Sequence, residues 1–122
     1  MEQYIYLLFV KWRYHMKINI AEDFSATPGG RLIKEGKNSG EEFRNDILIP
    51  KYKKAKESNE ILEINFDGTF GYSPSFLDEA FGGLVRIQKE KGIFNKIKII
   101  SNDNVGIERK IQKYMEEAEK QI

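Results

Sequence analysis

Two serines flank a proline in the segment GYSPSFLDEAFGGL, which spans residues 71–84. Ser73 followed by Pro74 is typical of a helix start, because a serine hydroxyl caps the free amides and proline needs no amide hydrogen in the first turn. Ser75 is the alternative cap, with Asp78 in place of the glutamate of a capping box. A phosphate on either hydroxyl would lie at the positive end of the helix dipole. We therefore expect Ser73 or Ser75 to cap a helix, and a phosphorylation switch is compatible with that role.

Two arginines have the chemistry to hold an anion. Arg31 follows a Gly-Gly turn, whose backbone amides could form an anion-binding nest. Arg44 lies in the first turns of a helix that we expect to begin at Ser39. Together the two guanidinium groups could bind a phosphate or a carboxylate of a partner. The alternative is that they form ion pairs with nearby acids of this chain: Glu41, Glu42, Asp46 or Asp78.

Acidic and imidazole side chains do not form a catalytic set. Asp78 and Glu79 are adjacent, so on a helix they point about 100° apart and do not converge. Asp67 follows a predicted strand, but no nucleophile, base or metal ligand joins it. His15 is the only histidine and there is no cysteine, which leaves little to bind a metal. We expect no enzymatic activity, no cofactor and no metal site.

The elements that must position these residues alternate between strands and helices. Strands are predicted at Lys17–Ile20, Ile61–Phe66 and Lys96–Ile100, and the nearly continuous apolar run of the second suggests a central strand covered on both faces at its start. The turn Ala26–Gly30 is expected to lead into a short strand at Arg31–Ile33, which would form a hairpin with the first strand. This alternation predicts an α/β sheet.

Three helices are predicted between these strands. Ser39 and Glu42 match a capping box, in which Glu42 would bond back to the Ser39 amide, and Pro50 predicts a break near Ile49. The second helix begins at Ser73 and ends near Lys89. The third is amphipathic, with four apolar residues on one face: Ile107, Ile111, Met115 and Ala118.

The second helix carries two phenylalanines and two glycines of particular interest, and packing inside the domain is the simplest interpretation of Phe70, Phe76 and Phe81. Phe76 and Phe81 are five residues apart, so we expect them on different sides of the helix, one facing the sheet and the other serving as a surface anchor. Gly82 and Gly83 each cost a helix about 1 kcal/mol relative to alanine. We expect close approach of another backbone, or of a partner, to compensate for that cost.

The first fifteen residues stand apart from this pattern. The apolar run Tyr4–Val10 is too short to span a bilayer, and acidic Glu2 before it does not fit a signal peptide. Residues 1–15 are either an extra strand or an extension upstream of Met16, and residues 16–122 form one domain. We expect a cytoplasmic protein that does not enter membranes. An edge strand in this run would also allow a homodimer.

The charge balance argues against a nucleic-acid partner. The chain has 20 basic and 19 acidic residues and a net charge of +1, whereas binding to a phosphate backbone usually needs a clustered positive excess. The basic run KYKKAK at residues 51–56 is interpreted as a solvated helix face, with an anion-binding patch as the alternative.

Two segments resemble a known family. GKNSGEEFRNDILIP (36–50) and FGYSPSFLDEAFGGL (70–84), together with the turn PGGR (28–31), resemble the STAS-like family of bacterial domains. That family is in turn similar to the STAS domains of anti-anti-sigma factors, and the likeness covers roughly residues 16–101. The resemblance implies a mixed sheet of four to five strands with three or four helices mainly on one face.

The resemblance also implies a function without catalysis. STAS domains bind protein partners, often a serine kinase of the histidine-kinase ATPase superfamily, and a serine at the helix start after the central strand is the phosphorylation switch. The anti-anti-sigma pattern is an aspartate, two serines and a glycine, with the second serine phosphorylated. Ser75 matches that second serine, while Ser73, Pro74 and Phe76 replace the aspartate, the first serine and the glycine.

Our leading hypothesis is therefore a regulatory domain that binds a protein partner, either a kinase-type ATPase or a transcription regulator. The alternative is a small-ligand or nucleotide-sensing module that uses Arg31 and the loop before Ser73. The predicted partner surface is the front of the second helix and comprises Tyr72, Ser73, Pro74, Ser75, Phe76, Glu79, Gly82 and Gly83.

Overall fold

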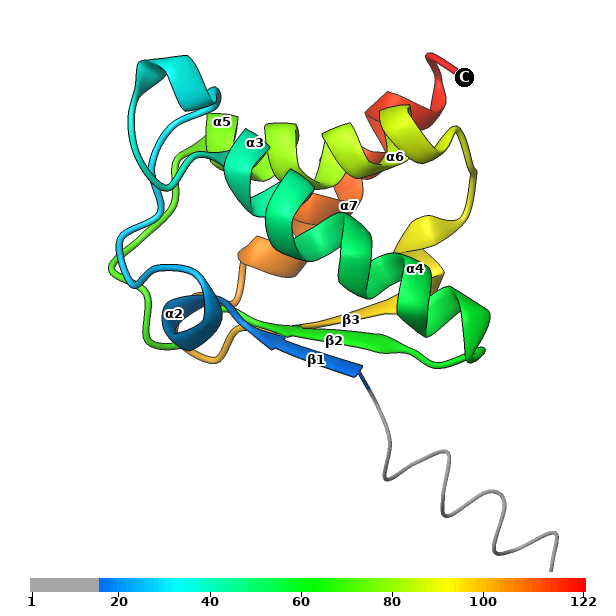
Figure 1. Ribbon diagram of the computed structural model, residues 1–122, viewed down its shortest axis with the longest axis horizontal. Coiled ribbons are helices and arrows are strands. Elements are labelled where there is room, and N and C mark those ends of the chain that lie inside the picture. Colours follow the sequence, from blue (N-terminus) through cyan, green and yellow to red (C-terminus); the bar gives the residue numbers. More distant parts are fainter. Residues whose placement is uncertain (1–15) are drawn as a thin grey trace, which may run out of the picture.

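The domain is built on a three-stranded parallel sheet in the computed structural model, which describes residues 16–122. The strands are β1 (Met16–Asn19), β2 (Leu62–Asn65) and β3 (Ile97–Ile100), in the order β1-β2-β3. The register places Ile64 between Ile18 and Ile99. The long helices all lie on one side of this sheet (Figure 1). The domain therefore has two layers, with the core between them.

Two long helices cross the sheet, and each contains a π-helical segment. The first consists of α3 (Gly40–Phe43), a π segment at Arg44–Leu48 and α4 (Ile49–Glu57). The second consists of α5 (Pro74–Leu77), a π segment at Asp78–Gly82 and α6 (Gly83–Gln88). The remaining elements are α2 (Ile20–Asp23), α7 (Ile107–Glu119) and short 3₁₀ turns at Ile33–Glu35 and Ile93–Lys96. None of the helices in the described range is long and apolar enough to cross a membrane.

Successive side chains along each strand point alternately into the core and to the open face, as expected for a sheet that helices cover on one face only. Five inward side chains are buried: Ile18, Leu62, Ile64, Ile97 and Ile99. Their neighbours point to the other face, where Lys17, Glu63 and Lys98 form a row across the sheet. The expectation that β2 is covered on both faces at its start is wrong, because Ile61 precedes the strand and is 42% exposed.

The predicted four to five strands are not confirmed. Residues 16–122 form three strands, and both strand pairs are parallel, whereas we expected a mixed sheet. Arg31–Ile33 is not a strand. The Leu32 amide donates to Glu35 Oε1 and the Ile33 amide to Glu41 Oε1, both at 2.9 Å, so this backbone is held by local carboxylates. The apolar run Tyr4–Val10 lies outside the described residues.

The predicted helix start at Ser39 is confirmed, whereas the predicted break near Ile49 is not. Ser39 Oγ accepts from the Glu42 amide at 3.0 Å, but the Glu42 carboxylate accepts from the Asn38 amide rather than from Ser39. Helix α4 continues through Pro50 without a break. Immediately before Pro50, the Ile49 amide donates to the carbonyl of Arg44, five residues back. The helix therefore departs from regular α-helical geometry through a π turn and not through a break. The four apolar residues predicted on one face of α7 are all buried.

Phenylalanine rings fill the core beneath the two long helices. Phe76 and Phe81 are both fully buried, and both pack against Phe43 with ring centroids 5.8 and 6.3 Å away. The expectation that one of them is a surface anchor is therefore wrong. The π segment between them widens the turn, which brings residues five apart to the same side of the helix.

Candidate functional site

The start of α5 carries the two serines singled out in the sequence. Ser73 is the cap: its Oγ accepts from the Phe76 amide at 3.0 Å and donates to the Gly29 carbonyl at 3.2 Å. Pro74 follows it in the first turn and is exposed. The Ser75 hydroxyl makes no hydrogen bond to any residue in the range 16–122, and the residue is partly exposed. The Ser73 hydroxyl is thus used by the fold, whereas the Ser75 hydroxyl is not used in a hydrogen bond by the described residues.

Alanine at each serine should separate these roles. We expect Ser73→Ala to lower the free energy of unfolding by about 1–2 kcal/mol, because it removes a helix cap and a second hydrogen bond. Ser75→Ala should change it by less than about 0.5 kcal/mol. Urea denaturation of both variants measures the difference. Equal losses would contradict the assignment of Ser73 as the cap.

The loop before this helix holds a phenylalanine in solvent. Phe70 is 86% exposed, although its amide donates to the Ala26 carbonyl at 2.8 Å. On either side, Thr69 Oγ1 and the Tyr72 hydroxyl donate to the Phe66 carbonyl at 2.9 and 2.6 Å. Burial of the Tyr72 ring raises the pKa of its hydroxyl, which therefore stays protonated as a donor. The loop is fixed by these bonds, so the exposure of Phe70 is built into the fold.

The two candidate anion-binding arginines pair with acids on the second helix. Arg31 Nη1 lies 2.9 Å from Asp78 Oδ2 and 3.4 Å from Glu79 Oε1. Arg44 is buried; it pairs with Glu79 Oε2 and also donates to the Glu79 carbonyl at 3.0 Å. The hydrogen bond to Asp78 is the main cause that raises the pKa of Arg31. The ion-pair alternative is therefore the one seen, although for Arg44 the acid is Glu79, which sequence spacing did not indicate.

Three residues of the predicted partner surface are inside the molecule. Phe76, Gly82 and Gly83 are buried, so they cannot form that surface in this structure. A Cβ on Gly83 would lie 2.6 Å from Arg44 Nη1. The neighbour of Gly83 is therefore a side chain of this protein, and not the backbone or the partner that was expected. Tyr72, Ser73, Pro74, Ser75 and Glu79 remain at least partly exposed.

Asp67 joins two loops at the carboxyl edge of the sheet. Its Oδ1 accepts from the Asp103 amide at 3.0 Å and its Oδ2 from Asn102 Nδ2 at 2.9 Å, and Asp103 Oδ2 accepts in turn from the Gly68 amide at 3.2 Å. The bond from the Asp103 amide is the main cause that lowers the pKa of Asp67. Residues 16–122 contain no group of three acids or histidines placed to hold a metal. Asp67 has a structural role that explains its position without catalysis.

A second polar cluster lies at the amino edge of the sheet. The Tyr52 hydroxyl donates to Glu90 Oε2 at 3.1 Å, Lys56 contacts Glu90 Oε1, and Lys96 Nζ lies 3.7 Å from Oε2. The bond from Lys56 is the main cause that lowers the pKa of Glu90. Burial, followed by the charge of Glu90, raises the pKa of Tyr52 to about 12. Glu90 and Lys96 were not predicted as part of a site. Tyr52 and Lys56 belong to the run at residues 51–56, which was interpreted as a solvated helix face with an anion-binding patch as the alternative.

The shift of Tyr52 predicts a loss of stability at high pH. The folded protein holds the phenolic proton above the ordinary pKa of 10.0, so this contribution is complete below pH 10 and is lost as pH rises towards 12. Across this window the free energy of unfolding should fall more steeply in the wild type than in Tyr52→Phe. Urea titrations at several pH values measure both slopes. Identical slopes would show that Tyr52 titrates normally.

The fold and site define an α/β domain whose helices cover one face of a parallel sheet and whose central strand leads to a capped, exposed helix start. Residues 39–106 match the family model described as a STAS-like domain of unknown function (DUF4325), and the chain belongs to this family. The matched range contains the Ser39 cap, β2, the Ser73 cap and β3, while Arg31 lies before it. No curated protein and no solved structure was found to match.

Proposed function

We propose that this protein is a cytoplasmic, non-enzymatic regulatory domain that binds a protein partner through its helix-tip surface, defined as Phe70, Tyr72, Pro74 and Ser75. The observation that carries the proposal is the 86% exposure of Phe70 on a loop fixed by backbone hydrogen bonds. The ring offers a large apolar surface to solvent from a fixed position, and phenylalanine is among the aromatic residues enriched at protein interfaces.

Ser75 is the residue we propose as the switch. It lies three and four residues before Asp78 and Glu79, the spacing at which helical side chains are neighbours where the helix is regular. A phosphate on Ser75 would repel both carboxylates and attract Arg31, which now bonds to them. Phosphorylation would thus add negative charge beside Phe70 and draw Arg31 away from its present partners. The partner classes that fit are a serine kinase of the histidine-kinase ATPase superfamily and a transcription regulator.

The switch can be tested by mass spectrometry of the intact protein. Purified full chain is incubated with ATP and an extract of the cell from which the sequence comes. We expect the wild type and Ser73→Ala to gain the mass of one phosphate and Ser75→Ala to gain none. No gain in any of the three would reject the switch. Equal gains in all three would place the phosphate elsewhere and reject Ser75.

The alternative, sensing of a small ligand or nucleotide through Arg31, has weaker support. Arg31 is partly exposed, but its guanidinium bonds to two carboxylates of the π segment that follows α5. An anionic ligand would have to displace Asp78 or Glu79 before it could use this charge. Addition of phosphate or nucleotides should then raise the thermal midpoint of the wild type but not of Arg31→Met.

A further inference from the structure

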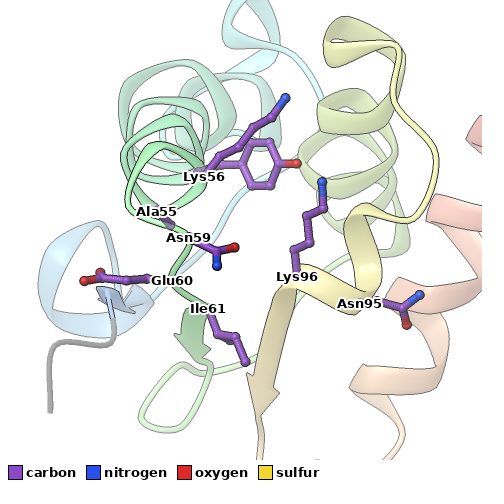
Figure 2. A pocket seen from close by; sticks show the side chains of 8 residues that line it. Ala55, Lys56, Asn59, Glu60, Ile61, Asn95 and Lys96 are labelled. Carbon is purple, nitrogen blue, oxygen red and sulfur yellow. The ribbon is translucent and has the colours of Figure 1, made fainter. Parts of the chain in front are cut away.

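A pocket of about 250 Å³ opens at the amino edge of the sheet. It lies between the end of α4, the residues that lead into β2 and the 3₁₀ turn that leads into β3 (Figure 2). The helix-tip surface follows the carboxyl end of β2, so the pocket is at the opposite edge of the sheet. It is therefore separate from the region assigned to the partner.

The pocket combines apolar walls with two ammonium groups. Ala55, Ile61 and the ring of Tyr52 provide the apolar surface, and Lys56 and Lys96 stand on its two sides (Figure 2). Asn59 directs its amide into the space between them, whereas the carboxylate of Glu60 points away (Figure 2). The groups that face the interior are thus apolar, neutral or positive.

Glu90 holds the two lysines without using all of their donors. Lys56 contacts one oxygen of this carboxylate, and Lys96 Nζ is 3.7 Å from the other, which is too far for a hydrogen bond. An ammonium group has three N–H donors, and that of Lys96 makes no hydrogen bond to any residue in the described range. Its side chain is 49% exposed at the rim of the pocket. An anion entering here would meet unused donors already in position.

We propose that this pocket binds a small organic anion, with its carboxylate or phosphate group on the pocket side of Lys96 and its apolar part against Ala55 and Ile61. The volume is below the usual range for drug-sized ligands, so the ligand has few non-hydrogen atoms. The second lining acid, Glu60, directs its carboxylate away from the space (Figure 2), so the two ammonium groups face only Glu90 and the interior has an excess of positive charge to attract the ligand. This inference does not depend on the proposed function.

The test is an NMR titration of the full chain with three probes: benzoate, its neutral analogue benzamide, and inorganic phosphate. We expect benzoate to shift the backbone amide signals of Asn59, Ile61 and Lys96 in a saturable way, and benzamide to produce no saturable shift. Phosphate should bind the same residues more weakly because it lacks the apolar part. Lys96→Met should weaken benzoate binding by about tenfold or more, the loss expected for a charge-assisted hydrogen bond.

Lys98→Met is the matched control. Lys98 is two residues further along the same segment and points to the open face of the sheet, so its loss should leave benzoate binding unchanged. The proposal is overturned if benzoate gives no saturable shift, if benzamide binds as tightly, or if both lysine variants lose binding equally. Phosphate binding as tight as that of benzoate would overturn the apolar half of the proposal. Unchanged signals in the rest of the spectrum show that each variant is folded.

Discussion

Glu79→Gln should lower the free energy of unfolding by about 3 kcal/mol. Arg44 is only 7% exposed, and its ionic partner is the Glu79 carboxylate. Glutamine keeps the shape of the side chain but leaves the guanidinium charge inside the protein without a counter-charge, which is the costly way to break a buried ion pair. The carbonyl of residue 79 can still accept from Arg44, so the loss should lie at the lower end of the usual range. Urea denaturation measures it from the midpoint and slope.

The neighbouring acid is the matched control for this variant. Asp78 pairs with Arg31 and Arg86, but all three side chains are about 30% exposed or more. Exposed ion pairs contribute little, so Asp78→Asn should cost less than about 1 kcal/mol. Both variants remove one carboxylate from the same helix and change the net charge equally. Similar losses would mean that the burial of Arg44 does not control the energy of this cluster.

Gly40→Ala should destabilise the domain by about 2–3 kcal/mol. A Cβ at Gly40 would lie 2.6 Å from the Phe76 carbonyl oxygen and 3.1 Å from the Glu79 Cβ. The carbonyl belongs to the backbone of α5, so the two helices would have to move apart over the core. The better helix propensity of alanine offsets at most about 1 kcal/mol of this. Thermal and urea unfolding should both report the loss.

Gly30→Ala provides the comparison for Gly40. No described atom lies within 4 Å of a Cβ at Gly30, and its φ is not positive. We expect a change within about 0.5 kcal/mol. If Gly40→Ala were equally harmless, the close approach of α3 and α5 would not be a feature of the folded protein.

Local chemistry explains which parts of the fold could be predicted. The caps at Ser39 and Ser73 depend on residues within three positions of each serine, and both are confirmed. The three strands were predicted from the alternation of polar and apolar residues in the first, a nearly continuous apolar run in the second and an apolar side in the third. Sequence patterns of this kind contain enough information because the interactions that form them are short in range.

The π segments could not be predicted in this way. A π turn has no clear sequence signature and persists where packing between elements favours it. Arg44–Leu48 and Asp78–Gly82 contact each other across the two long helices, so each depends on the other. For this reason ideal helical spacing placed Phe76 and Phe81 on different sides, and spacing within one helix could not identify Glu79 as the partner of Arg44.

The proposed helix-tip surface differs in composition from the surface that the sequence suggested. Tyr72 and the start of the second helix were named from the sequence, and the structure adds the exposed Phe70. Phe70 was interpreted as a packing residue, and this is wrong because exposure depends on which neighbours cover a side chain, which is set by the whole fold. Gly82 and Gly83 differ from Phe70 in the other direction. They were predicted to lie on a partner surface, but they are buried, and Gly83 makes room for the side chain of Arg44. The surface that we propose for a partner is therefore smaller and lies nearer the loop than the sequence suggested.

The central claim, that the helix tip is where a partner binds, is tested most directly by photo-crosslinking in the source cell. The photoreactive residue benzoyl-phenylalanine is placed at position 70 and, as a control, at position 87, where Ile87 on α6 is also exposed. We predict a discrete adduct with another protein from position 70 that is absent from position 87 and that disappears in Ser75→Glu. No adduct from position 70, or the same adducts from both positions, would contradict the account.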